Sequence, residues 1–176
     1  MPFDLSFSTI DALVHFLKTD FEDFFDDVSY DDKRNYYMNY KNYMVFNHDI
    51  DCENTEEGYE KLKIRYKNRI QNFRDCLKSN EHLFFIYNNF HLNNEQKIND
   101  LFSIISGKRL NKNFTLIVLD MNVTIHKALL NEKIELCAIK HPFNEWNDWH
   151  LKENKEKCMD LYWKFEKFVK KIIEEK

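Results

Sequence analysis

The chain has 176 residues, of which 43% are hydrophobic and 16% aromatic, so it can bury one substantial core. Only 2 Gly and 2 Pro occur, which argues against an all-β sandwich or barrel with its many tight turns and excludes a Gly-rich phosphate loop. The net charge of -4 comes from acidic and basic residues mixed along the chain, so we expect no nucleic-acid partner.

The first half of the sequence predicts two helices with a short strand between them. Residues 8–26 carry apolar side chains at helical spacing, and Ser8 with Asp11 fits a capping box. The acidic end of this helix is unfavourable for the helix dipole, so we expect fraying or a basic neighbour there. Residues 43–46 are the best candidate strand, and residues 56–79 return to helical spacing.

The second half of the sequence predicts strands that alternate with helices. Short, nearly continuous apolar runs predict buried strands at 82–87, 114–120 and 134–140. Helical spacing recurs at 93–107 and 152–175, and residues 121–133 fit either a short helix or an irregular segment. The alternation predicts an α/β fold: a Rossmann-like sandwich with a small, mostly parallel sheet flanked by helices, forming a single domain over residues 1–176.

The cysteines and the apolar runs predict where the protein works. The four cysteines form no CxxC pair, which favours free thiols in a reducing compartment: Cys52, Cys76, Cys137 and Cys158. The first ten residues do not read as a signal peptide, and no stretch of about 18 apolar residues occurs. We therefore expect a cytoplasmic protein without a membrane span.

Polar side chains follow three of the predicted strands. His48 and Asp49 follow the first strand, Asp120 ends the strand at 114–120, and His141 follows the last. Because neighbouring parallel strands end at one edge of a sheet, these four are the candidate catalytic residues. Two simpler interpretations stay open: the His48–Asp49 pair only turns the chain, and Asp120 caps the end of its strand.

Cys52 lies in the same short segment as His48, which leaves open a thiol beside a base. Free cysteines, however, are more often inert small apolar residues. Together with Asp49 and Asp51 the segment holds potential metal ligands, but not at a recognised ligand spacing. We therefore predict neither a metal nor another cofactor.

Three segments in order carry a family resemblance: "PFDLSFSTIDALVHFLKTDFEDFFD", "VFNHDID" and "YEKLKIRYKNRIQNFRDCLKSNEHLFFIYNN". Over roughly residues 2–122 the chain resembles a bacterial and viral domain family of unknown function that is labelled papain-like cysteine peptidase. The matching residues are Pro2, Phe3 and Asp4 at the start, His48 and Asp49 in the His-Asp element, and Arg69 with Phe73 in a basic-aromatic helix. The resemblance implies a thiol-dependent hydrolase or acyltransferase with His48 as general base.

Two departures from that family shape the expectation about activity. Leu5 stands where the family often has Trp, and the family's nucleophilic Cys segment, upstream of the PFD motif, has no counterpart here. We therefore expect either a truncated chain or a catalytically incomplete one. The alternatives are a non-catalytic protein that binds a small-molecule or peptide ligand, and an enzyme acting on sugar conjugates, with Trp146 and Trp149 stacking on sugar rings. The oligomeric state is left open.

Overall fold

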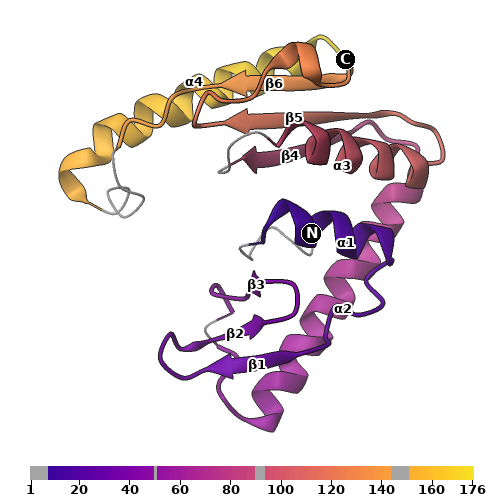
Figure 1. Ribbon diagram of the computed structural model, residues 1–176, viewed down its shortest axis with the longest axis vertical. Coiled ribbons are helices and arrows are strands. Elements are labelled where there is room, and N and C mark those ends of the chain that lie inside the picture. Colours follow the sequence, from indigo (N-terminus) through magenta and orange to yellow (C-terminus); the bar gives the residue numbers. More distant parts are fainter. Residues whose placement is uncertain (1–7, 50, 90–93, 144–150) are drawn as a thin grey trace. The chain divides into compact units, whose positions relative to one another are not determined.

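A computed structural model describes residues 8–49, 51–89, 94–143 and 151–176 (Figure 1). The chain divides into two compact units: unit 1 comprises residues 1–81 and 100–113, and unit 2 comprises residues 82–99 and 114–176. The prediction of one domain over the whole chain stays a prediction. Six residues named above lie outside the described residues: Pro2, Phe3, Asp4, Leu5, Trp146 and Trp149.

The first helix of unit 1, α1 (Ile10–Lys18), is shorter than predicted. Its cap is Thr9 rather than Ser8, because the Thr9 Oγ1 accepts the backbone N–H of Ala12 at 3.2 Å. The helix ends well before residue 26, since Asp20 and Phe21 take positive φ angles of 51° and 65°. Continuing the helix would have placed a run of carboxylates at its negative end.

Basic side chains surround the acidic segment that follows α1, as the sequence predicted. Asp23 lies 2.7 Å from the His15 Nε2 and 3.1 Å from the Lys41 Nζ. Asp20 lies 2.9 Å from an Arg74 nitrogen. These contacts offset the negative charge locally.

A three-stranded antiparallel sheet follows in unit 1, formed by β1 (Val28–Asp31), β2 (Tyr36–Asn39) and β3 (Met44–Val45). The strand predicted at 43–46 is therefore part of an antiparallel sheet, and the expectation that it joins a parallel sheet is wrong. The connections are short turns, and only antiparallel neighbours can be joined so closely, because a parallel pair needs a long crossover.

The longest helix, α2 (Glu56–Lys78), completes unit 1 together with the last part of α3 (Glu95–Lys108). Its buried face recurs at helical spacing: Leu62, Tyr66, Ile70, Phe73 and Leu77. At its C-terminus the buried Arg109 guanidinium donates to the backbone oxygens of Cys76 at 2.6 Å and Glu81 at 2.5 Å. This cation ties the end of α2 to the segment that follows it.

Unit 2 contains a three-stranded parallel sheet in the order β4-β5-β6, formed by β4 (Leu83–Asn89), β5 (Phe114–Asp120) and β6 (Ile134–Ala138). The central strand β5 is buried along its whole length. These strands confirm the predicted small parallel sheet within a mixed α/β protein. The Rossmann-like arrangement stays a prediction.

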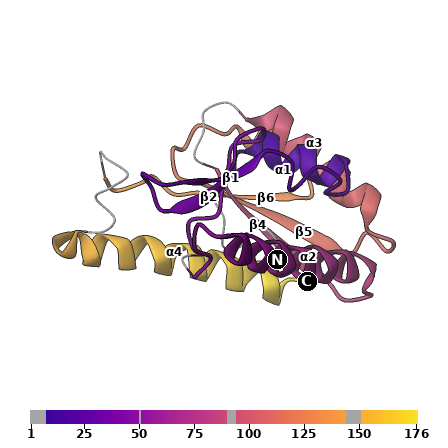
Figure 2. The ribbon, with the colours of Figure 1, turned by 90° about the horizontal axis from the view of Figure 1, so that it is seen from below.

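The helix α4 (Lys155–Glu174) lies along the sheet of unit 2 (Figure 1, Figure 2). Its Leu161, Phe165 and Phe168 pack against Leu119 and Cys137 of the sheet. A short 3-10 helix, η3 (Lys152–Asn154), precedes α4.

The connection from β5 to β6 is irregular apart from a 3-10 helix, η1 (Lys127–Leu129), which agrees with the ambiguity of residues 121–133. It is tied to the start of α3, because Asn99 donates to the Leu129 oxygen at 2.8 Å. Among the described residues, none of the helices combines the length and the apolarity that crossing a membrane requires.

Candidate functional site

The loop between β3 and α2 carries the predicted His-Asp element, and two turns shape it. The backbone N–H of Asp49 donates to the Phe46 oxygen at 3.2 Å, and that of Cys52 donates to the Asp49 oxygen at 2.9 Å. His48 stays exposed to solvent, whereas Asp49 is buried, with 3% of its surface exposed. The two halves of the predicted dyad therefore occupy different environments.

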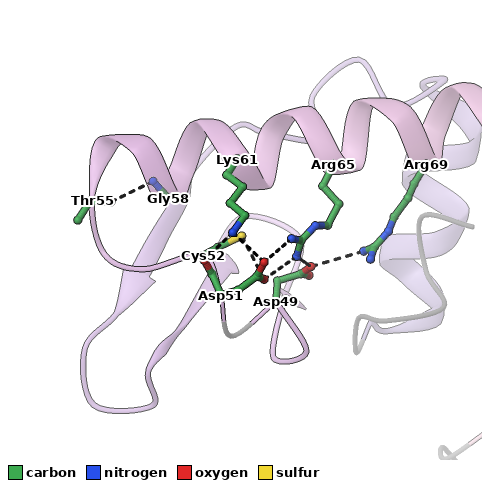
Figure 3. A network of polar contacts seen from close by, with 8 residues as sticks. All are labelled: Asp49, Asp51, Cys52, Thr55, Gly58, Lys61, Arg65 and Arg69. Atoms are coloured by element: carbon green, nitrogen blue, oxygen red, sulfur yellow. Dashed lines mark hydrogen bonds and ion pairs between the residues drawn. The ribbon is translucent and has the colours of Figure 1, made fainter.

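The carboxylate of Asp49 is held by two side chains of α2, Arg65 and Tyr66, of which Figure 3 shows Arg65. Its Oδ1 accepts a hydrogen bond from the Arg65 Nη1 at 2.5 Å, and its Oδ2 accepts one from the Tyr66 hydroxyl at 2.8 Å. Burial and the neighbouring Asp49 charge raise the pKa of Tyr66, so its hydroxyl stays protonated and remains a donor. Both oxygens of the carboxylate are thus engaged in holding the loop against α2.

A second carboxylate from the same loop, Asp51, forms the exposed side of this network (Figure 3). Arg65 donates to it with both terminal nitrogens, at 2.9 Å to Oδ1 and 2.7 Å to Oδ2, and the Lys61 Nζ lies 2.8 Å away. The Arg65 guanidinium and the Lys61 ammonium hold the pKa of Asp51 well below its usual range. Asp51 therefore carries its charge throughout the ordinary pH range.

Arg69, one further turn along α2, is the least satisfied member of the network. Its guanidinium lies over the Tyr66 ring, with Cζ 4.6 Å from the ring centroid. Its Nη1 is 3.8 Å from the Asp49 Oδ1, which is an ion pair but too long for a hydrogen bond. This buried nitrogen has no hydrogen-bond acceptor within the structure that is described.

The thiol of Cys52 lies beside the network but is not activated by it. The residue is 2% exposed, and burial raises the pKa of its thiol. The closest polar contact of Sγ is with Asp51 Oδ1, at 3.9 Å, and a carboxylate does not favour a thiolate. The Cys52 thiol is thus covered and protonated, which does not suit a nucleophile.

Asp120 lies in unit 2, at the carboxyl end of β5, and is fully buried. Its carboxylate accepts backbone N–H groups of the following loop: Asn122 at 3.2 Å, Thr124 at 2.7 Å and Ile125 at 2.8 Å. These bonds fix the chain as it leaves the strand, in a loop where Val123 takes a positive φ of 55°. This geometry matches the capping role of Asp120 that the sequence left open.

His141 follows β6 at the same end of the parallel sheet. Its backbone N–H donates to the Met121 oxygen at 2.7 Å, and its Nδ1 accepts the Phe143 backbone N–H at 3.3 Å. Asn89, which is paired with Asp120 in the sheet register and fully buried, is the neighbouring polar residue on β4. Asp120 and His141 therefore share one sheet end, as predicted for parallel strands.

The four predicted site residues are divided between the two units and their separate sheets. His48 and Asp49 follow a strand of the antiparallel sheet in unit 1, whereas Asp120 and His141 follow strands of the parallel sheet in unit 2. The condition for their convergence on one edge, that their strands be parallel neighbours in a single sheet, is not met. The physical reason is that β3 is joined to β2 by a tight turn and cannot enter a parallel sheet.

The sequence reasoning missed the residues that complete the unit 1 network. Lys61 and Arg65 were not connected with the loop from the sequence, although Lys61, Arg65 and Arg69 recur every four residues along the helix. That spacing places three cations on one stripe, facing the loop with Asp49 and Asp51 (Figure 3). A basic stripe beside an acidic loop was the signal available.

No model of a known protein family, no curated protein and no solved structure matches this chain. Within the described ranges, no group of three or more His, Cys, Asp or Glu side chains is arranged to hold a metal ion. The fold and the site together define a mixed α/β protein with a partly buried ion-pair network on its longest helix.

Proposed function

We propose that this protein acts by non-catalytic binding and that Arg69 recognises an anionic group, a carboxylate or a phosphate, on a small-molecule or peptide ligand. The observation that carries the proposal is the buried Arg69 Nη1, which lacks an acceptor within the described structure. Native proteins rarely leave a buried donor unsatisfied, and a missing ligand is one of the accepted explanations.

The charge balance of the network supports this proposal. Three cations, Lys61, Arg65 and Arg69, face two carboxylates, Asp49 and Asp51, so one positive charge remains. Arg65 and Lys61 are engaged by direct hydrogen bonds or short ion pairs. Of the three cations, Arg69 therefore has the longest contact with a carboxylate, 3.8 Å to Asp49.

The geometry of Arg69 suits recognition of an anion. The contact with Tyr66 restrains the guanidinium, and 18% of the Arg69 side chain is exposed to solvent. A planar, immobilised guanidinium can offer two parallel N–H donors to a carboxylate or phosphate. Little conformational entropy is lost when such a group binds.

Thiol catalysis, which the family resemblance implies, finds less support at this loop. His48 is exposed, whereas the Cys52 thiol is buried and its pKa is raised. The thiolate that nucleophilic catalysis requires is therefore disfavoured at Cys52. The Asp49 carboxylate, which would orient His48, is bonded to Arg65 and Tyr66 instead. Binding is therefore the function favoured by this geometry.

The test compares two variants of α2 that each remove one positive charge. Inorganic phosphate and acetate serve as probes in calorimetric titrations of the wild-type chain, Arg69→Gln and Lys67→Gln, where Lys67 is an exposed lysine of the same helix. We expect Arg69→Gln to weaken binding roughly ten- to a hundredfold, as for loss of a hydrogen bond to a charged group, and Lys67→Gln to change it little. Equal weakening by both variants, or equal binding by wild type and Arg69→Gln, contradicts the proposal.

A further inference from the structure

The charge of the network on α2 is unevenly distributed between its exposed and its buried members. Asp51 and Lys61 are both half-exposed and lie 2.8 Å apart, so their charges offset each other near the solvent. The less exposed members are the carboxylate of Asp49 and the guanidinium groups of Arg65 and Arg69. Two cations and one anion therefore share the partly buried part of the network, which leaves a surplus of one positive charge.

A ligand at Arg69 meets this surplus through a single side chain. Arg69 lies in the interior of α2 (Glu56–Lys78), so the free N–H groups at the start of that helix do not reach it. The terminal nitrogens of Arg65 are directed at Asp49 and Asp51 (Figure 3). Phosphate sites, by contrast, commonly combine several donors, at a helix N-terminus or in a cluster of Arg side chains.

A ligand oxygen bound to the Arg69 Nη1 would also lie close to the carboxylate of Asp49. The Nη1 is 3.8 Å from the Asp49 Oδ1, and an acceptor lies about 3 Å from its donor nitrogen, so the two oxygens are less than about 7 Å apart. A like charge at short range disfavours the ionisation of a neighbouring group. Asp49 therefore opposes a second negative charge on the ligand.

The charge of the ligand group enters the binding free energy in two opposing ways. Its attraction to a fixed cation is proportional to its charge, whereas the cost of removing it from water rises with the square of the charge. A dianion thus gains about twice the attraction of a monoanion but loses about four times the hydration. With one surplus cation and Asp49 beside it, the balance favours a single negative charge.

We propose that the group recognised by Arg69 is a singly charged carboxylate rather than a doubly charged phosphate, an inference that rests on the proposed function. The carboxylates of Asp49 and of the ligand then balance the guanidinium groups of Arg65 and Arg69, with two charges of each sign. A carboxylate also presents two coplanar oxygens that match the donors of a guanidinium.

Methyl phosphate is the probe that tests the charge preference, because it changes from a monoanion to a dianion with a pKa of about 6. Phosphorus NMR measures this pKa for the free probe and, extrapolated to saturation, for the bound one. The proteins carry His48→Gln, since the exposed imidazole next to Asp49 belongs to the residue type whose charge changes in this pH range. A tenfold preference for the monoanion raises the pKa of the bound probe by about one unit, which is the result we expect. A bound pKa equal to the free value or below it overturns the proposal.

Acetate and N-acetylglycine are the carboxylate probes, titrated calorimetrically against the same proteins. At about pH 8, where methyl phosphate is a dianion, we expect acetate to bind on the order of tenfold more tightly than methyl phosphate. Tighter binding of methyl phosphate contradicts the proposal. N-acetylglycine carries the carboxylate of a peptide C-terminus, so binding tighter than that of acetate identifies a peptide end as the source of the carboxylate.

Two variants with the same chemical change test the role of the surplus charge. Asp51→Asn adds one positive charge to the balance of the network, whereas Asp75→Asn makes the same change at an exposed position of α2 outside it. We expect the pKa of bound methyl phosphate to fall towards the free value in Asp51→Asn and to keep its raised value in Asp75→Asn. The same bound pKa in both variants would show that the network does not set the preference, and would refute the proposal.

Arg69→Gln distinguishes a wrong ligand class from a wrong site. If acetate and methyl phosphate both lose affinity in this variant but methyl phosphate binds with a lowered pKa, binding by Arg69 stands and only the carboxylate preference fails. If Arg69→Gln binds both probes as well as the protein with Arg69 does, the proposed function fails, and the carboxylate preference fails with it.

Discussion

The role of Asp49 can be tested by Asp49→Asn, which keeps the shape of the side chain and removes its charge. Asp49 is 3% exposed and accepts hydrogen bonds from Arg65 at 2.5 Å and Tyr66 at 2.8 Å. An amide has one oxygen in place of two, so its NH₂ group would face a donor. The variant therefore loses a charge-assisted bond and leaves the Arg69 charge without a nearby carboxylate.

The expected cost follows from this geometry. Removing one partner of a buried ion pair costs about 3–5 kcal/mol. Arg65 keeps its two-pronged contact with Asp51, so we place the loss for Asp49→Asn near the lower end, at about 3 kcal/mol. The measurement is urea unfolding followed by far-UV circular dichroism, with the free energy obtained by linear extrapolation.

Asp51→Asn is the matched control, because the same chemical change occurs in the same loop on a carboxylate that is half-exposed. Its side chain is 50% exposed, so solvent screens its ion pairs with Lys61 and Arg65 and the loss of stability should be clearly smaller. If Asp49→Asn costs no more than Asp51→Asn, the carboxylate of Asp49 does not hold the loop and the reasoning fails.

Two further predictions concern the glycines and the thiols. A Cβ at Gly58 would lie 2.1 Å from the Glu53 backbone oxygen, whereas one at Gly107 meets nothing within 4 Å. Thermal unfolding should therefore show Gly58→Ala destabilised by about 1–3 kcal/mol and Gly107→Ala stabilised by about 0.5–1 kcal/mol, and the same sign for both would be inconsistent with this packing. Burial raises the pKa of Cys52, and it raises the pKa of Cys137 to about 11. A thiol in the unfolded chain has a pKa of about 8.5. The two buried thiols therefore stabilise the fold fully below about pH 8.5, and this stabilisation is lost as the pH rises through their folded-state pKa values. Between about pH 5 and about pH 9, iodoacetamide should label the half-buried Cys76 and Cys158 first. Early labelling of Cys52 would contradict its burial.

The sequence predicted the parallel sheet better than the antiparallel one, and the reason lies in the chain itself. β5 is an unbroken apolar run because both of its faces are buried, and such a run is visible without any structure. β1 contains polar residues and is defined by its turns and by its partner β2, to which it pairs from Val28 to Asp31. Local pattern thus identifies strands whose burial is complete and misses short ones whose burial depends on distant neighbours.

The candidate site shows the same limit for side-chain contacts. The buried carboxylate of Asp49 meets Arg65, sixteen residues further along the chain, and nothing in the loop itself specifies that partner. By contrast, the bonds of Asp120 are local, to residues two, four and five positions ahead, so a capping role could be anticipated. Contacts between neighbours in sequence follow from residue type, and those between elements follow only from the fold.

The His-Asp element illustrates why a motif in sequence order does not by itself assign a reaction. A catalytic Asp must accept a hydrogen bond from the imidazole that it orients. Here both oxygens of Asp49 are taken by α2, and the adjacent His48 is exposed to solvent. The guanidinium at 2.5 Å and the buried hydroxyl at 2.8 Å fix Asp49 on the side of α2, and no hydrogen bond joins it to His48 in the described structure. Asp49 therefore holds the loop against α2, and Arg69, whose contact with Asp49 is the longer one, is the group to which our proposal assigns ligand binding.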